Sequence, residues 1–502
     1  MSERVRTVVI GAGIAGLAYA HARGEGADLI VLEAREVAGG LIRTAPTPDG
    51  HVELGPEALQ DNAPETNALL DELQLAPLPS RAEAAKRFVL DAAGRPRALP
   101  SNPSAFLRSP LLSWRGKLRA LSEPFRARDR ALDGSVADFL RHRVGREVVE
   151  RLVDPAISGI YAGDPELLSA RACFPAVVEM VERHGSLFAG LRARGRERRA
   201  ARAAGTARAA DLASAASAAG AAGGESSSSA ADAASKGPAL LSLPGGLQRL
   251  PEALAERLGA RLRLNTPVAG LQRDAKAWRI QLEADALTAD ELVLAVPAPV
   301  GARLLAQIAP SLSQQLASMR AENVVSVAHR WARADLAHPL DGFGVLVPSS
   351  LGKRHLGTLF SSSIVPGRCG DEHVLLRTLL GGARRPELVD APDAELLDIV
   401  QHEVGELLDA RAGAAPNWSL ITRWPNALPR YDLEQPARQH AIDAALAELP
   451  GLTILGNHRR GISVNALIAN SRETAREHAA GAGAPSADHA NPASHAHGDH
   501  DA

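Results

Sequence analysis

A glycine-rich segment near the N-terminus carries the clearest chemical signal in this sequence. Gly11, Gly13 and Gly16 follow the β-branched run at residues 6–10, and the helix-forming residues 17–23 come next. In such a context the first glycine permits a tight turn, the second lets the backbone approach a pyrophosphate, and the third lets helix and strand pack closely. The helix N-terminus offers unpaired N–H groups to the phosphates. The spacing therefore predicts a dinucleotide-binding loop.

An acidic residue follows at the distance that a ribose contact requires. Glu33 ends a second apolar run, and it lies 22 residues after Gly11. Its carboxylate can accept hydrogen bonds from both ribose hydroxyls, which disfavours NADP. The glycine pair Gly39–Gly40 follows, and Gly456–Asn457 ends a predicted strand ahead of a C-terminal helix. Both features resemble the extended signature of flavoproteins, so the sequence favours FAD over NAD.

The predicted FAD contacts come from both ends of the chain, which we expect to build one cofactor domain. The last helix would present its N-terminal N–H groups to the pyrimidine end of the flavin, where reduced flavin is negatively charged. The predicted contacts are Gly11, Ala12, Gly13, Ile14, Ala15, Gly16, Glu33, Ala34, Gly40, Leu41, Gly55, Pro56, Val268, Gly456, Asn457, Ser463, Val464 and Asn465.

Composition limits the other classes of function. Lys and Arg number 56 and Asp and Glu 58, so the net charge of −2 argues against a nucleic-acid partner, which needs a basic excess. Cys173 and Cys369 form no CxxC pair, so we predict no disulfide framework and no metal site. Neither a signal peptide nor a long apolar run is found, which predicts a cytoplasmic protein. Peripheral contact with the cytoplasmic face of a membrane and a homodimer are left open.

Several further motifs resemble those of one family. They are Glu53–Pro56, Ser158–Pro165, Leu243–Leu247, Gly342–Pro348, Gly357–Ser362 and Gly456–Asn465. Together they resemble the protoporphyrinogen/coproporphyrinogen oxidases, within the superfamily of monoamine-oxidase-like flavoproteins, from the N-terminus to about Arg476. Arg430 stands where the family often has Gln, and Ala466 where an acid is common. These departures concern the electrostatics of the pocket and the flavin contacts.

The resemblance implies an oxygen-dependent FAD oxidase that converts protoporphyrinogen IX to protoporphyrin IX in haem biosynthesis. Three hydride transfers to flavin would release hydrogen peroxide, and no side chain need be catalytic because the flavin performs the chemistry. Arg87 is expected to bind a propionate by a charge-assisted contact, and Phe360 and Leu346 to form apolar walls. Coproporphyrinogen III as substrate, a related amine oxidase or carotenoid desaturase, and a flavin-binding scaffold without turnover remain alternatives.

The implied fold is α/β, with a Rossmann-like FAD-binding domain, a mixed-sheet substrate domain, and a helical domain that contacts the membrane in some members. Arginine and then Ala, Gly and Ser dominate one internal stretch, which therefore predicts a flexible insertion. The expected divisions are 1–85, 238–300 and 448–480 for the FAD domain, 86–190 for a mainly helical domain that contacts substrate or membrane, 191–237 for the insertion, 301–447 for the substrate domain and 481–502 for a disordered tail.

Overall fold

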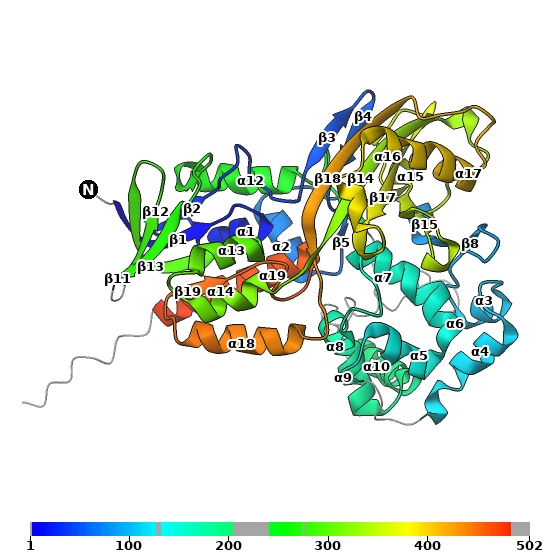
Figure 1. Cartoon of the computed structure of the whole chain (residues 1–502), viewed down its shortest axis with the longest axis horizontal. Helices are drawn as coiled ribbons and strands as arrows, with labels where there is room; N and C mark the ends of the chain where they lie inside the picture. The colour runs from blue at the N-terminus through cyan, green and yellow to red at the C-terminus, as the bar shows by residue number, and fades with distance from the viewer. Residues whose placement is uncertain (1–2, 127–131, 204–239, 275–276, 483–502) are drawn as a thin grey trace, which may run out of the picture.

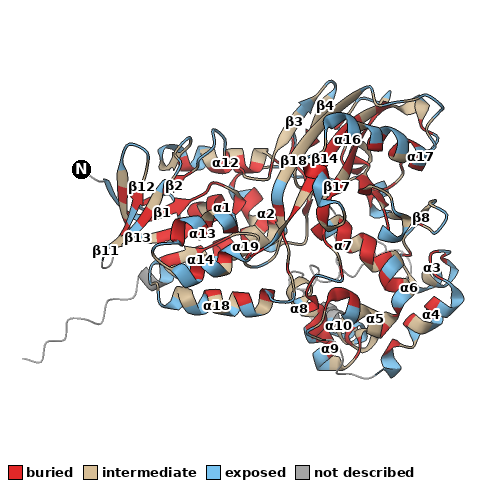
Figure 2. Cartoon of the chain, in the orientation of Figure 1, coloured by how far each residue is buried: buried red, intermediate tan, exposed pale blue. Residues whose placement is uncertain are grey.

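The computed structural model describes residues 3–126, 132–203, 240–274 and 277–482. Two large sheets and a group of helices make up this part of the chain, and the helical group lies below the second sheet in the view of Figure 1. Buried residues concentrate along both sheets and on the inner faces of the helices that cover the first one (Figure 2).

The first sheet has the strand order β10-β2-β1-β13-β12-β11, and β19 also pairs with β13. Strands β10, β2, β1, β13 and β19 run parallel, whereas β11 and β12 are antiparallel additions at one side. Val8 and Val9 are both fully buried because helices cover both faces of this sheet. The strand bounds are β1 Glu3–Ile10, β2 Leu29–Leu32, β10 Leu262–Arg263, β11 Gly270–Asp274, β12 Ala277–Gln281, β13 Ala286–Leu294 and β19 Leu452–Ile454.

Two sets of helices cover the two faces of the first sheet. One face carries α1 (Ile14–Ala22), α2 (Pro64–Glu72), α12 (Arg249–Leu258) and α19 (Val464–Ala482). The other face carries α13 (Ala298–Leu305), α14 (Pro310–Ala317) and α18 (Gln435–Ala447). The structure therefore corrects the predicted division at residues 300 and 447. Leu312 and Ile442 are fully buried in the core of the first sheet, although the predicted division places both in the substrate domain.

The second sheet has the order β18-β14-β17-β16-β15-β7-β8. Neighbouring strands are antiparallel except for β15 and β7, which run parallel. Strands β7 and β8 lie at the start of the stretch 86–190, which is predicted to be mainly helical, and they join this part of the chain to the second sheet. The bounds are β7 Phe88–Leu90, β8 Pro96–Ala98, β14 Ala321–Ala332, β15 Gly344–Leu346, β16 His355–Leu359, β17 His373–Gly381 and β18 Trp418–Pro429.

Short strands connect the two large sheets. The hairpin of β3 (Thr44–Thr47) and β4 (Gly50–Glu53) packs on the second sheet, because Val52 shares a small core with Ala328 and Leu375. A separate three-stranded sheet has the strand order β5-β9-β6. Its bounds are β5 Leu59–Gln60, β6 Leu78–Pro79 and β9 Leu240–Ser242.

Helices α3 to α10 form the remaining group, and α15 to α17 accompany the second sheet (Figure 1). Helix α10 runs through residue 190, so the predicted insertion would begin inside a helix, and α19 includes residues 481 and 482 of the predicted tail. Residues 204–237 and 483–502 lie outside the described residues. The bounds are α3 Pro103–Arg108, α4 Trp114–Leu121, α5 Val136–Val144, α6 Arg146–Val148, α7 Asp154–Tyr161, α8 Ala170–Cys173, α9 Pro175–His184, α10 Leu187–Ala203, α15 Ser361–Ile364, α16 Asp393–Ile399 and α17 Gly405–Leu407.

Candidate cofactor and substrate site

The predicted cofactor residues gather where the parallel strands of the first sheet end. Ile10 of β1 pairs with Leu294 of β13, which in turn pairs with Ile454 of β19. The residues that follow β1 and β19, Gly11 and Gly456, therefore leave the same edge of the sheet. Ligands of α/β sheets bind outside the carboxyl ends of the strands, so this edge is the expected place for a cofactor.

The three loop glycines differ in what surrounds them. A Cβ atom on Gly11 would lie 2.5 Å from the carbonyl oxygen of Ala295, and one on Gly16 would lie 2.0 Å from that of Gly11. These two positions need glycine for close packing. In contrast, no heavy atom lies within 4 Å of the Cβ position of Gly13. The open space beside Gly13, just ahead of the first turn of α1, fits a pyrophosphate that approaches the backbone.

The remaining residues of this loop and Glu33 close the adenosine end of the candidate site. Ala12, Ile14 and Ala15 are buried, so only their backbone can face a ligand. One carboxylate oxygen of Glu33 accepts a hydrogen bond from the Ala12 amide at 2.8 Å, and the other accepts one from the Arg35 amide at 3.0 Å. The strand end thus fixes this carboxylate beside the glycine loop. Two further predicted contacts also lie here: Ala34 is exposed, and Val268 packs partly buried against the sheet core.

Residues far apart in the sequence complete the flavin end. The Gly39 amide donates to the Ala12 carbonyl at 2.8 Å, and a Cβ on Gly40 would lie 3.2 Å from the Cα of Gly13. A Cβ on Gly55 would lie 1.9 Å from the carbonyl oxygen of Leu41. The second glycine pair and the stretch that ends in Pro56 therefore contact the same surface.

The C-terminal segment is fixed by capping and by neighbouring elements. Ser463 caps α19, because its hydroxyl accepts a hydrogen bond from the Ala466 amide at 3.1 Å just after Val464. Asn465 donates to the Gln60 carbonyl at 2.9 Å, while its side-chain oxygen is buried with no hydrogen-bond partner. The side chain of Asn457 donates to the Ala427 carbonyl at 3.3 Å, so it points toward β18.

Arg87 lies immediately before β7 of the second sheet and carries a charge that no acidic side chain among the described residues neutralises. Its guanidinium lies 5.5 Å from the ring centroid of Phe343, and no carboxylate among the described residues pairs with it. The residue keeps exposed surface, yet desolvation by the surrounding protein lowers the pKa of the guanidinium. A partly desolvated cation without an acidic partner is suited to binding an anion. Phe343 was not predicted, although it lies inside the Gly342–Pro348 motif.

The two predicted apolar walls behave differently. Leu346 is half-buried on β15, and its side chain lies where a Cβ on Gly159 of α7 would meet it at 2.6 Å. Phe360 is 0% exposed, and its ring lies 5.4 Å from the ring of His338 in a core cluster. Phe360 therefore presents no surface to a ligand, and the expectation that it contacts substrate is corrected. The whole Phe360 ring is buried in this core cluster.

Arg430 and Ala466, the two residues that depart from the family pattern, each contact a residue that accommodates the change. Arg430 donates to a carboxylate oxygen of Glu322 at 2.6 Å, and this bond raises the pKa of the arginine. Its charge is therefore neutralised on β14. Ala466 lies against Gly461, where a Cβ would come within 2.7 Å of the Ala466 Cβ. A small residue at position 466 is consistent with this close contact.

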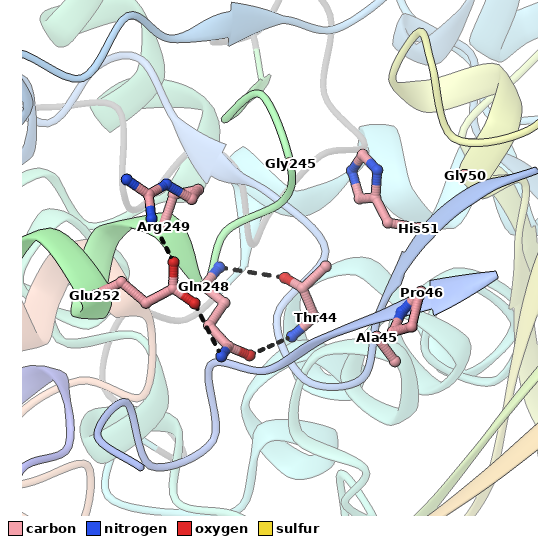
Figure 3. Close-up of a pocket in the computed structure, with 9 residues that line it drawn as sticks. All are labelled: Thr44, Ala45, Pro46, Gly50, His51, Gly245, Gln248, Arg249 and Glu252. Atoms are coloured by element: carbon pink, nitrogen blue, oxygen red, sulfur yellow. Dashed lines mark hydrogen bonds and ion pairs between the residues drawn. The ribbon is translucent and has the colours of Figure 1, made fainter.

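A recess of about 230 Å³ lies between the β3–β4 hairpin and the start of α12 (Figure 3). Figure 3 shows Arg249 pointing to Glu252, which neutralises it, and Gln248 bonded to Thr44. None of the predicted cofactor or substrate contacts lines this recess, so we do not place the chemistry there. The lining residues are Thr44, Ala45, Pro46, Gly50, His51, Gly245, Gln248, Arg249 and Glu252.

A comparison with family models matches residues 14–477 to the flavin containing amine oxidoreductases. The chain belongs to this family. It is therefore an FAD-dependent oxidoreductase with a mixed α/β fold, which confirms the class of enzyme, the cofactor and the fold class predicted from the sequence. Within the described residues, no helix combines the length and the hydropathy that crossing a bilayer requires.

Members of the family with curated names cover nearly the whole chain. The chain is 29% identical to the chloroplastic protoporphyrinogen oxidase of Nicotiana tabacum over 94% of its own length and 84% of the relative. It is 34% identical to the coproporphyrinogen III oxidase of Propionibacterium freudenreichii, with 97% and 93% covered. The crystal structure of a candidate protoporphyrinogen oxidase from Exiguobacterium sp. matches with a TM-score of 0.75 at 23% identity, covering 95% of this chain and 98% of that one.

Proposed function

We propose that this flavoenzyme oxidises protoporphyrinogen IX to protoporphyrin IX, with molecular oxygen as the final electron acceptor. Arg87 carries the proposal, because a partly desolvated guanidinium without an acidic partner suits a substrate with carboxylate arms. An alkylammonium substrate of an amine oxidase would be repelled by it, and a carotenoid offers it no charge. The name of the tobacco relative points to the same substrate.

The two large sheets would have different roles, one in binding the cofactor and the other in binding the substrate. The first sheet would hold FAD at the open face of Gly13, at Glu33 and at the N-terminus of α19, and the second sheet would hold the macrocycle. When bound, FAD supplies the hydride acceptor and passes the electrons on to oxygen. Arg87 would bind a propionate, and Leu346 would help to exclude water beside the ring. Orientation in an apolar slot is what this chemistry asks of the protein.

Coproporphyrinogen III is the second candidate substrate. The relative from Propionibacterium, which has this activity in its name, is 34% identical, compared with 29% for the tobacco enzyme. The two substrates differ in the number of carboxylate arms, while their reacting carbons are alike. Arg87 would serve either one, so a direct comparison of the two substrates is needed.

The experiment follows porphyrin fluorescence after each porphyrinogen is added to the purified chain in air. The protein should be yellow, with a bound-flavin spectrum, and should form porphyrin faster than the enzyme-free control, with about three molecules of peroxide per porphyrin. Without oxygen, the substrate should bleach the flavin. A yellow protein that neither porphyrinogen bleaches would contradict the proposal and favour a scaffold without turnover.

We also propose peripheral contact with a membrane through one end of the helical group. Helix α4 exposes Trp114, Leu118 and Leu121 at helical spacing, and the neighbouring Phe125 is 91% exposed. Exposed arginines at positions 108, 115 and 126 flank this apolar surface. An apolar stripe flanked by cationic side chains is typical of elements that lie in the headgroup region of anionic bilayers.

A further inference from the structure

Two buried ion pairs join β17 and the loop before it to the segment from the end of β4 to Glu57. Glu53 pairs with Arg368 at 2.9 Å, and Glu57 pairs with Arg377 at 3.1 Å. The arginine side chains are 0% and 3% exposed and the glutamate side chains 1% and 6%. Burial of four charges is costly. The pairing offsets this cost only in part, because both Glu57 carboxylate oxygens and the Nε atoms of both arginines are buried without a hydrogen-bond partner. Sequence analysis did not detect this group, because its members are up to 324 positions apart.

Arg377 makes more contacts than neutralising Glu57 requires. One of its terminal nitrogens donates to the Glu53 carbonyl at 2.8 Å and to the Gly55 carbonyl at 2.5 Å. The other terminal nitrogen faces the Glu57 carboxylate. The planar guanidinium of Arg377 thus contacts three alternate residues, at positions 53, 55 and 57. The flexible side chain of a lysine could not make all of these contacts.

Gly55 is held from two sides. Its Cα faces the Leu41 carbonyl so closely that a Cβ would lie 1.9 Å away, and its own carbonyl is bound by Arg377. Leu41 belongs to the cofactor unit, whereas Arg377 belongs to the second sheet. The position of Gly55 therefore reports where one unit lies relative to the other, and any shift of Arg377 reaches Leu41 through Gly55.

We propose that Arg377 is a positioning residue for the oxidation. It sets the distance between the substrate sheet and the flavin by fixing Gly55, and so places the donor carbon of the substrate at the hydride acceptor. This inference rests on the proposed function and on the prediction that Leu41 and Gly55 contact the flavin. Hydride transfer depends steeply on this distance, since displacements of about 1 Å can slow a reaction by roughly a hundredfold.

Arg368 provides a matched control within the same group. It is equally buried and pairs with Glu53. It also donates to the Ser242 hydroxyl at 3.2 Å and makes a long hydrogen bond of 3.5 Å to the Glu57 carbonyl. No hydrogen bond joins it to Gly55 in the described structure. Loss of Arg368 removes the cation that faces Glu53 and should therefore destabilise the fold, while the bond from Arg377 to the Gly55 carbonyl remains in place.

The test compares Arg377→Met, Arg368→Met and the double variant Arg377→Met/Glu57→Gln in the full-length, FAD-containing protein. Two measurements are made: the visible spectrum of the bound oxidised flavin, and the rate at which protoporphyrinogen IX reduces that flavin without oxygen. For Arg377→Met we expect a shifted spectrum and reduction about tenfold slower or more, with KM changed less than about twofold. Arg368→Met should lower the melting temperature and keep the rate within about twofold of wild type.

The double variant separates positioning from charge. It removes the unpaired Glu57 carboxylate, so its melting temperature should recover relative to Arg377→Met, whereas the spectrum and the slow reduction should persist. Recovery of the rate in the double variant, or a wild-type spectrum and rate in Arg377→Met, would overturn the proposal. If Arg377→Met does not fold, Arg377→Lys replaces it in the test, and we expect the same shifted spectrum and the same slow reduction. A wild-type protein that binds FAD but is not reduced by porphyrinogen would refute the proposed function, while the spectra would still test Arg377.

Discussion

The hydroxyl of Tyr431 donates a hydrogen bond to the backbone carbonyl of Asn457 at 2.6 Å. Tyr431 follows β18 of the second sheet, and Asn457 follows β19 of the first. The ring of Tyr431 also lies 6.4 Å from the ring of Tyr161 in α7. Burial raises the pKa of the Tyr431 hydroxyl, so it stays protonated and acts as a donor. One side chain thus connects both sheets and the helical group next to the predicted flavin segment.

Tyr431→Phe should weaken FAD binding, because the segment at Asn457 loses the bond that fixes it. A hydrogen bond of this kind contributes about 1 kcal/mol, so we expect roughly a fivefold rise in the FAD dissociation constant, measured by flavin fluorescence. Tyr161→Phe is the control. The Tyr161 hydroxyl donates to the Cys173 carbonyl within the helical group, so its loss should leave FAD affinity unchanged. Equal weakening in both variants would contradict a specific role for Tyr431.

Gly13→Val should abolish FAD retention and leave the fold intact. The backbone of Gly13 is extended, with φ of −71° and ψ of 172°, and its Cβ position is open, so valine fits the protein but blocks the pyrophosphate. Gly16→Ala should instead lower the melting temperature, because the added Cβ would clash with the Gly11 carbonyl. Absorbance near the flavin bands and thermal unfolding distinguish the two. A yellow, FAD-loaded Gly13→Val protein would remove the loop from the cofactor site.

Arg87→Ala should raise KM for the porphyrinogen more than it lowers kcat. A charge-assisted hydrogen bond contributes about 1.5–3 kcal/mol, which corresponds to roughly a ten- to hundredfold change in KM. Lys86→Ala is the neighbouring control, because Lys86 is exposed and pairs with Asp341. Steady-state porphyrin fluorescence gives both constants. If Arg87→Ala keeps the wild-type KM, the cation does not bind the substrate.

His458 should make the fold sensitive to mild acid. Burial and the nearby Arg459 lower the pKa of this histidine to about 4, from an ordinary value of 6.5. The unfolded chain takes up the proton first, so the stabilisation is complete above pH 6.5 and is lost as the pH falls toward 4. The slope from one such group is at most about 1.4 kcal/mol per pH unit. Urea unfolding at several pH values should show that the unfolding free energy of His458→Leu depends less steeply on pH than that of wild type. The variant His440→Leu, at an exposed position, should show the same pH dependence as wild type.

Replacement of the apolar surface on and beside α4 should weaken attachment to anionic vesicles. Trp114→Ser with Phe125→Ser removes two large exposed rings, and burial of each such ring contributes about 1.5–3 kcal/mol. We expect co-flotation with the vesicles to fall about tenfold or more. Leu433→Ser, at an exposed apolar position outside this surface, should have no effect. Equal flotation of all three proteins would contradict the proposed contact.

Much of the cofactor end could be predicted from the sequence because its geometry is local. The close contact of Gly16 with the Gly11 carbonyl, the extended backbone at Gly13 and the capped start of α19 at Ser463 each depend on neighbours in the chain. Local patterns could not show the partners of Arg377 or the ring of Phe343 over Arg87, since strand register brings these residues together. The same reason explains the error at Phe360, whose aromatic character fits a substrate wall and a buried core equally well.

The sequence by itself determined the cofactor class, because a strand, a glycine loop and a helix at this spacing depend on short-range sterics and hydrogen bonds. Tertiary structure alone decided which sheet each amphipathic helix covers and which side chains meet between the sheets. Helices α14 and α18 carry an apolar face that either sheet could bury, and the chain path places both on the first. Long-range packing, and not local propensity, therefore sets the boundary between the cofactor and substrate units.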